Sequence, residues 1–209
     1  MPDLSKARTT TLPASVPTQM ARLSNAASAT RLILRGIDAI EPAGRAFGVT
    51  IPTRPCSSAI AGERAAFWLG PDEWLLLAPE SETSALWQTL TTALEGIPCA
   101  LVDISHRQTA LLLEGPGAAA MLNAGVPLDL SLKAFPVGMV ARTIFEKAEI
   151  VLFRSGEQAF RVEVWRSFAP YVLGLLQAAD RDAPDHGVAR QMGTAPDQGQ
   201  ETSAIEAQW

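Results

Sequence analysis

The sequence predicts an α+β fold built from two related halves, each with antiparallel strands and helices packed on one face of them. The first observation is a strand–turn–strand–helix pattern that occurs twice. WLGPDEWLLLAPESETSALWQTL, from Trp68, resembles FRSGEQAFRVEVWRSFAPYVLGLL, from Phe153. The second is a match between RLILRG, from Arg31, and TALLLEG, from Thr109, each followed by the pattern of a short helix. The two offsets, 85 and 78 residues, are close enough to indicate an internal duplication.

Length and composition allow a sizeable core. The chain has 209 residues, enough for one domain or one bilobed unit, and 47% of them are hydrophobic. The net charge of −5 and a pI near 5.1 argue against nucleic acid and anionic membranes as main partners. The sequence has no apolar leader and no run of about 18 apolar residues, so we expect a soluble, cytoplasmic protein.

Three segments are expected along the chain. Residues 1–30 are rich in Ser, Thr, Ala and Pro, which predicts a flexible N-terminal arm or an extended segment that wraps a neighbour. Residues 31–179 form the α+β domain. Residues 180–209 are polar, with two prolines and three glycines, and predict a disordered C-terminal tail.

Apolar periodicity and turn residues place the elements of the first half. Proline and aspartate in Gly70-Pro71-Asp72-Glu73 predict a tight turn between two strands. Thr50–Arg64, with two prolines and a glycine, is loop-like. The expected elements are strand Arg31–Arg35, helix Ala39–Phe47 capped by Asp38, strands Ala66–Leu69 and Trp74–Ala78, and helix Ser81–Leu94 capped by Ser81.

The second half is expected to repeat this order. Gly115-Pro116-Gly117 predicts a turn that opens a helix; its proline lacks an amide that a phosphate would need. Thr109–Leu113 either continues the strand before it or pairs with it. The expected elements are strands Ala100–Ile104 and Thr109–Leu113, helix Pro116–Ala124, strands Val140–Phe145, Glu149–Phe153 and Phe160–Trp165, and helix Ser167–Ala179 capped by Ser167.

A polar cluster between two strands is the first candidate site. Asp103 and His106, three residues apart, could form an acid/base pair, or with Arg107 could anchor an anionic ligand. Alternatively they form the hydrated rim between the strands, or an interface, and we favour this interpretation.

Arginines among the last three strands form the second candidate site. Fourteen of the 17 cationic residues are arginines, whose forked guanidinium suits carboxylates at interfaces, although a GC-rich genome gives the same bias. We expect the arginines of these strands to line an open sheet face, either solvated or docked to an acidic partner: Arg142, Arg154, Arg161 and Arg166. Neither Cys56 nor Cys99 has CxxC spacing or a nearby histidine, so both are expected as free thiols and no metal site is predicted.

Several motifs together resemble the gamma-subunit family of heterotetrameric sarcosine oxidases. They are FWLGPDEWLLLAP at Phe67–Pro79 and, within Val102–Ala179, the motifs DISHR, GPGA, PLDL, FPVG with a following RT, and WRSFA. The resemblance covers Arg31 to Ala179. It implies the fold of the folate-binding domain of glycine-cleavage aminomethyltransferases, in agreement with the two related halves.

The resemblance also implies a function. The whole complex oxidises sarcosine to glycine, releases hydrogen peroxide and passes the one-carbon unit to tetrahydrofolate. It implies FAD, FMN, NAD and tetrahydrofolate sites in the alpha and beta subunits and zinc in the delta subunit, with no cofactor in this chain. The gamma chain would be non-catalytic and pack chiefly against alpha. The resemblance assigns no catalytic residue to this chain. The candidates for an interface or a vestigial ligand site are Asp103, His106, Arg107, Arg142 and Arg166.

Two other functions stay open. One is a stand-alone folate-binding or aminomethyl-transferring protein, with Asp103 as the anchor of the folate amine. The KGCYxGQ-type motif of folate-binding relatives is missing from the sequence, which argues against independent folate chemistry. The other is a small regulatory binding module that uses the ancestral ligand cleft.

Overall fold

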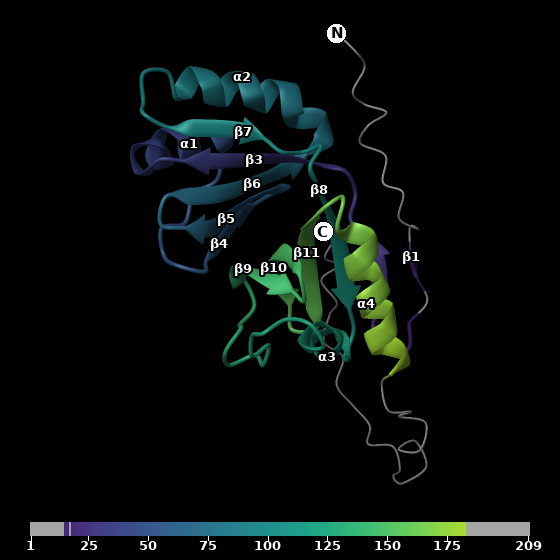
Figure 1. Ribbon diagram of the computed structural model, residues 1–209. Coiled ribbons are helices and arrows are strands. Elements are labelled where there is room, and N and C mark those ends of the chain that lie inside the picture. The colour runs from purple at the N-terminus through teal and green to yellow at the C-terminus, as the bar shows by residue number, and fades with distance from the viewer. Residues whose placement is uncertain (1–14, 17, 183–209) are drawn as a thin grey trace, which may run out of the picture.

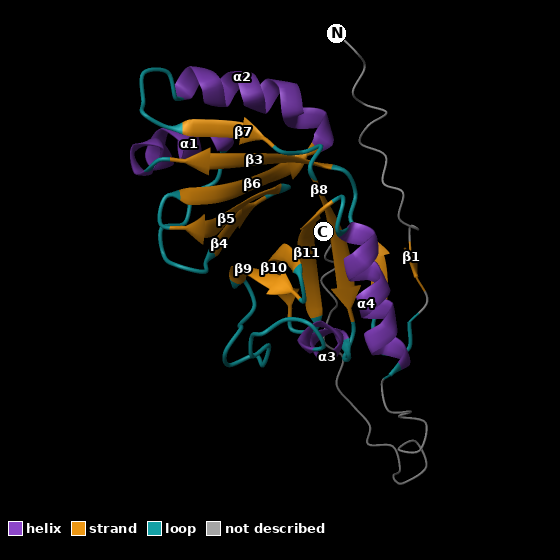
Figure 2. Cartoon of the chain, viewed as in Figure 1, coloured by secondary structure: helices purple, strands orange, loops and turns teal. Residues whose placement is uncertain are grey.

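The computed structural model describes residues 15–16 and 18–182 (Figure 1). Two antiparallel sheets face each other, and each carries helices on its outer face, which gives four layers (Figure 2). The strands of the first half are β2 (Arg22–Asn25), β3 (Ala29–Arg35), β4 (Ser58–Ala61), β5 (Arg64–Gly70) and β6 (Glu73–Pro79), and its helices are α1 (Ile40–Phe47) and α2 (Thr83–Ala93).

The second half has the same order of elements. Its strands are β7 (Ala100–Asp103), β8 (Gln108–Glu114), β9 (Val140–Phe145), β10 (Ala148–Gly156) and β11 (Ala159–Trp165), and its helices are α3 (Ala118–Asn123) and α4 (Ala169–Arg181). A two-residue strand, β1 (Ser15–Val16), precedes both halves. The predicted α+β class with two related halves is therefore confirmed.

The internal duplication extends to the hydrogen-bonding register. The order β4-β5-β6-β3 in one sheet matches β9-β10-β11-β8 in the other. Both hairpins have a register shift at the same place, between Trp68 and Gly70 and between Arg154 and Gly156. These positions are 86 residues apart, so the offset of 85 in the sequence comparison was one residue short.

Each half supplies one strand to the sheet of the other half. β2 precedes β3 in the chain but pairs with β8, whereas β7 precedes β8 but pairs with β3. Two equivalent hydrogen bonds mark the crossing: Ala26 N donates to Ala110 O at 3.0 Å, and Ile104 N donates to Arg31 O at 2.9 Å. Each sheet is therefore built from both halves.

Three apolar cores hold the layers together. One lies between each sheet and its own helices, and the third lies between the sheets. In the third core the rings of Phe67 and Phe153, which are equivalent residues of the two halves, have centroids 4.6 Å apart. β3 and β6 are covered on both faces, which explains why their sequences are continuous apolar runs instead of alternating patterns.

The ends of the domain differ from the sequence prediction. The expected arm ended at residue 30, yet Arg22–Asn25 pairs with β8 and β3 begins at Ala29. The expected tail began at residue 180, yet α4 continues to Arg181. Residues 1–14 and 183–209, which include the rest of both predictions, lie outside the described residues.

Smaller corrections concern helix starts and one strand. The serines expected to cap helices make no capping hydrogen bond, because a 3₁₀ turn (Glu80–Glu82) and a plain turn precede α2 and α4. Asp38 likewise lies in a 3₁₀ turn and does not cap α1. β4 lies within the segment expected to be a loop. None of the helices in the described part of the chain is long and apolar enough to cross a membrane.

Candidate functional site

The predicted acid/base cluster lies in the connection from β7 to β8. The carboxylate of Asp103 accepts hydrogen bonds from Ser105 N at 2.8 Å and from Ser105 Oγ at 2.5 Å, which stabilises the turn. His106 is half-buried and Arg107 is exposed. Among the described residues no hydrogen bond joins Asp103 to His106, so this geometry lends no support to an acid/base pair.

Two of the predicted site residues come together, and one lies apart from them. Arg166 N donates to Arg107 O at 2.9 Å, which joins the β7–β8 connection to the end of β11. The Arg107 guanidinium lies 4.6 Å from the ring centroid of Trp165, a cation–π distance. Arg142, on β9, instead contacts the Glu73 carboxylate of β6 in the other sheet, with Nη1 to Oε2 at 3.3 Å.

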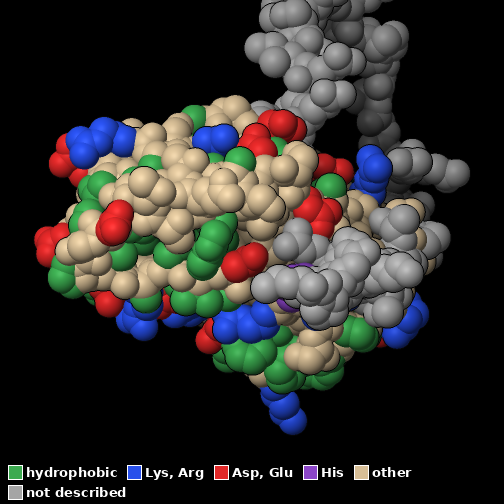
Figure 3. All heavy atoms as spheres, turned by 90° about the horizontal axis from the view of Figure 1, so that it is seen from above, with side chains coloured by type: hydrophobic (Ala, Val, Ile, Leu, Met, Phe, Trp, Pro, Cys, Tyr) green, Lys and Arg blue, Asp and Glu red, His purple; other side chains and the backbone are tan. Residues whose placement is uncertain are grey.

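The arginines of the last three strands do not form one open basic face. Arg154 is only 3% exposed, so its predicted place on such a face is wrong. It donates to the carbonyl oxygens of four residues and lies over the Phe160 ring; the four are Leu130, Phe135, Gly156 and Glu157. Burial lowers the pKa of Arg154 and Glu157 opposes that shift. On the face seen in Figure 3, basic, acidic and hydrophobic side chains are interspersed.

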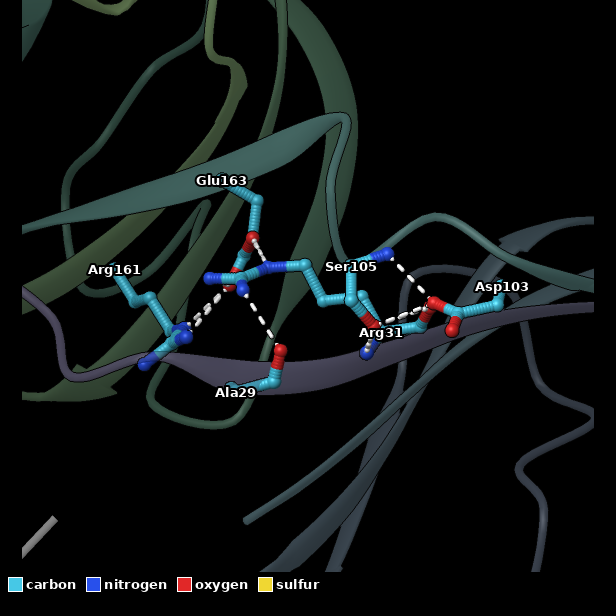
Figure 4. A network of polar contacts seen from close by, with 6 residues as sticks. All are labelled: Ala29, Arg31, Asp103, Ser105, Arg161 and Glu163. Carbon is cyan, nitrogen blue, oxygen red and sulfur yellow. Dashed lines mark hydrogen bonds and ion pairs between the residues drawn. The ribbon is translucent and has the colours of Figure 1, made fainter. Parts of the chain in front are cut away.

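A buried ion pair links the two sheets (Figure 4). Arg31 Nε of β3 donates to Glu163 Oε2 of β11 at 2.6 Å, and Arg161 Nε donates to Glu163 Oε1 at 2.8 Å. Arg31 is 3% exposed and Glu163 is 1% exposed. Burial raises the pKa of Glu163, but Arg31 and Arg161 together lower it further, so it lies below its ordinary value.

At the equivalent positions of the duplication, Ala110 and Leu77 stand in place of this ion pair. In the strand register Arg31 pairs with Leu77, and the equivalent pair in the other half is Ala110 with Glu163. In the first half the β3 residue is charged and its β6 partner is apolar, whereas in the second half the β8 residue is apolar and its β11 partner is charged. In the sequence Arg31 appeared to be only the polar end of a strand, and nothing in the linear pattern indicated its partner 132 residues away.

A small cavity lies where the two crossing connections meet. Its volume is about 30 Å³, and it is lined by Gln108, whose buried Oε1 has no hydrogen-bond partner among the described residues. Equivalent residues of the two halves line it in pairs: Ala27 with Ser105, Ala29 with Gln108, and Glu80 with Arg166. Both halves thus contribute to the lining of the cavity. A space of this size holds water, whereas pockets for drug-sized ligands measure roughly 300–1,000 Å³, so a folate does not fit it.

The Gly-Pro-Gly turn docks the N-terminal segment instead of an anion. Gly117 N donates to Met20 O at 3.0 Å, and a Cβ on Gly117 would lie 2.4 Å from the Met20 Cβ. From α4, the buried carboxylate of Asp180 accepts hydrogen bonds from Gln19 N and Met20 N, each at 2.8 Å. Sequence reasoning missed Asp180, because its polar neighbours suggested a tail.

No group of three or more His, Cys, Asp or Glu side chains within residues 15–16 and 18–182 is placed to hold a metal ion. Cys56 and Cys99 are free and half-buried.

Comparison with known proteins shows that the model of the sarcosine oxidase, gamma subunit family matches residues 38–182. The chain belongs to this family.

Curated members of the gamma-subunit family support the assignment. The chain is 37% identical over 134 residues to the sarcosine oxidase subunit gamma of Corynebacterium sp. strain U-96, which covers 63% of each protein. It is 38% identical over 118 residues to the subunit gamma of an Arthrobacter sp., which covers 56% of this chain and 57% of that protein. The matches thus span less than two thirds of these relatives.

Solved structures place the gamma-subunit fold among its relatives. A chain of the heterotetrameric sarcosine oxidase from Corynebacterium sp. U-96, in complex with pyrrole 2-carboxylate, matches with a TM-score of 0.74 and 33% identity. The match covers 81% of this chain and 88% of that chain. The glycine cleavage system aminomethyltransferase T from Bartonella henselae matches with a TM-score of 0.58 and 19% identity, over 77% of this chain and 48% of that chain; this likeness shows the shared fold alone.

Proposed function

We propose that this chain is the non-catalytic gamma subunit of a heterotetrameric sarcosine oxidase and that it supports assembly of the complex. The observation that carries the proposal is the match of 88% of a chain in a heterotetrameric sarcosine oxidase. The side-chain chemistry agrees with a supporting role. Asp103 is bonded to Ser105, and Glu163 to Arg31 and Arg161, so these carboxylates stabilise the fold.

The proposed complex demethylates sarcosine oxidatively to glycine, with tetrahydrofolate as one-carbon acceptor and release of hydrogen peroxide. FAD, FMN, NAD, tetrahydrofolate and zinc would be held by the alpha, beta and delta subunits. This chain would contact chiefly alpha. The candidate interface residues from the sequence are Asp103, His106, Arg107, Arg142 and Arg166.

A stand-alone folate-binding or aminomethyl-transferring protein receives no support from the small cavity where the crossing connections meet, which cannot hold a folate. The Asp103 carboxylate, the proposed anchor of the folate amine, is engaged by the backbone and hydroxyl of Ser105.

Co-expression tests the proposal. The tagged chain is expressed with the alpha, beta and delta subunits, and the purified material is examined by size-exclusion chromatography and by a sarcosine oxidation assay. We expect one stoichiometric complex whose yield depends on the chain. We also expect Asp103→Asn to leave the turnover of the assembled complex unchanged. Failure of the wild-type chain to enter the complex would refute the structural role, and loss of turnover in an assembled Asp103→Asn complex would refute the non-catalytic one.

A further inference from the structure

We propose that one corner of the second half binds a carboxylate-bearing, partly apolar segment of a partner subunit. The surface consists of Arg107, Trp165, Phe168 and Tyr171, and we call it the corner patch. The inference rests on the proposed function, because the partner is taken to be a subunit of the same oxidase. It adds to that function a location and a chemistry for the contact.

Backbone hydrogen bonds bring the corner patch together. Arg166 N donates to Arg107 O at 2.9 Å, and Phe168 N donates to Trp165 O at 2.9 Å. Tyr171 lies in the first turn of α4, three residues after Phe168, and therefore on the same side of the chain. Phe168 is 40% exposed and Tyr171 is 39% exposed, and Arg107 is exposed above the Trp165 ring. The backbones of Arg107, Trp165 and Phe168 are thus joined at one corner, with Tyr171 one turn further on.

The first half provides an internal comparison. At the equivalent backbone positions it carries small or acidic residues: Ser28 in the crossing connection, and Pro79, Glu82 and Ala85 around the start of α2. In both corners the last strand has the same register, and the helix begins at the equivalent residue, Thr83 or Ala169. Folding of this corner therefore does not require exposed aromatic side chains, and their presence in one half points to binding. Trp, Tyr and Arg are also the residue types that most often dominate binding energy at interfaces.

The charge of the corner patch indicates the chemistry of its occupant. The Arg107 Cζ lies 4.6 Å from the Trp165 ring centroid, so the indole holds the guanidinium by one contact while its N–H donors can still bind a carboxylate. No carboxylate of the described residues lies within ion-pair distance of it. A stacked guanidinium is already ordered, so it loses little rotamer freedom when it binds a carboxylate. Phe168 and Tyr171 would bury apolar atoms beside that carboxylate.

The test transplants the first corner onto the second. Phe168→Glu and Tyr171→Ala, combined, give the corner the residues that the first half carries, and Arg107→Ser does the same for the connection. Matched controls are Trp87→Ala, an aromatic residue on α2 that is 37% exposed, and Arg45→Gln, an exposed arginine on α1.

The full-length variants are titrated against the co-expressed alpha, beta and delta subunits by biolayer interferometry, at low and high salt. We expect Phe168→Glu/Tyr171→Ala and Arg107→Ser each to weaken binding at least about tenfold, and both controls to bind like wild type. Arg107→Ser should also reduce the salt dependence of association, since it removes a charge from the contact. Melting temperatures close to wild type confirm folding, and Arg107→Gln repeats the test with a longer side chain.

The outcomes separate the two proposals. If wild type binds and the corner variants bind equally tightly, the corner patch is not the contact, and the assembly role stands. If the controls weaken binding as much as the corner variants, the assignment to this corner is likewise overturned. If wild type itself does not bind the other subunits, the proposed function fails and the corner patch fails with it.

Discussion

Replacing the buried ion pair between the sheets one residue at a time, and then both residues together, tests how the two halves are joined. The single variants are Arg31→Met and Glu163→Leu. Leucine at position 163 reproduces Leu77, its equivalent in the first half. Methionine at position 31 retains most of the volume of the arginine stem without the charge.

The structure sets the expected magnitudes. Glu163→Leu leaves the Arg31 guanidinium, which is 3% exposed, without its carboxylate; breaking a buried pair in this way costs about 3–5 kcal/mol of unfolding free energy. Arg31→Met leaves Glu163 with Arg161 alone, at 2.7–2.8 Å, so its cost is at the lower end of that range. The double variant removes both buried charges. It loses the bond from Arg31 to Ala29 O and leaves Arg161, whose side chain is 20% exposed, without its carboxylate, which costs about 2 kcal/mol in all.

Equilibrium urea unfolding of the purified chain, followed by circular dichroism and tryptophan fluorescence, measures these free energies. We expect the double variant to be more stable than Glu163→Leu alone, with a coupling energy of about 4–6 kcal/mol. In thermal melts each single variant should melt roughly 6–20 °C below wild type. If the free energies of the two single variants simply add up in the double variant, the pair does not act as a unit and this reasoning is wrong.

Three further predictions concern stability. The pKa of Glu163 is lower in the folded protein than its ordinary 4.5. Its contribution to stability is therefore complete above pH 4.5 and disappears as the pH falls through the folded pKa. The urea midpoint should accordingly decline more steeply between pH 6 and 3 for wild type than for the Arg31→Met/Glu163→Leu double variant. Gly117→Ala should lower the free energy of unfolding by about 2 kcal/mol, because the added Cβ meets the backbone of Met20. Gly174→Ala, in open space on α4, should raise it by about 0.5–1 kcal/mol. Equal melting temperatures of the two variants would contradict this contrast. Arg154→Lys should lower the free energy of unfolding by about 2–4 kcal/mol, because an ammonium cannot reach all four carbonyl groups that Arg154 binds. A calorimetric melt unchanged from wild type would show that these four hydrogen bonds are dispensable.

The duplication could be predicted because it consists of local sequence patterns. Apolar runs, a tight acidic turn and a helix recur in the same order, and each depends only on neighbours in the sequence. The continuous run RLILR predicted a strand, and it lies within β3. The family resemblance came from the same conserved order of motifs and agrees with the family match over residues 38–182.

The features of the fold that the sequence did not predict depend on contacts between segments that are distant in the chain. Arg22–Asn25 is short and has no clear alternation, and its stability comes from β8, almost 90 residues later. Arg31 is charged, so it suggested a strand end, yet the Glu163 carboxylate compensates its charge inside the protein. Asp180 appeared to begin a tail, although its carboxylate holds the backbone of Gln19 and Met20.

The reciprocal placement of β2 and β7 makes the molecule resemble a domain-swapped dimer contained in a single chain. A unit with the sequence of one half would lack an edge strand, and a second unit would have to supply it. Deleting residues up to 25 would consequently expose the edge of β8, which belongs to the C-terminal half. Despite its repeat, the protein is therefore expected to unfold in one cooperative transition and to have no point at which it can be divided into two stable domains.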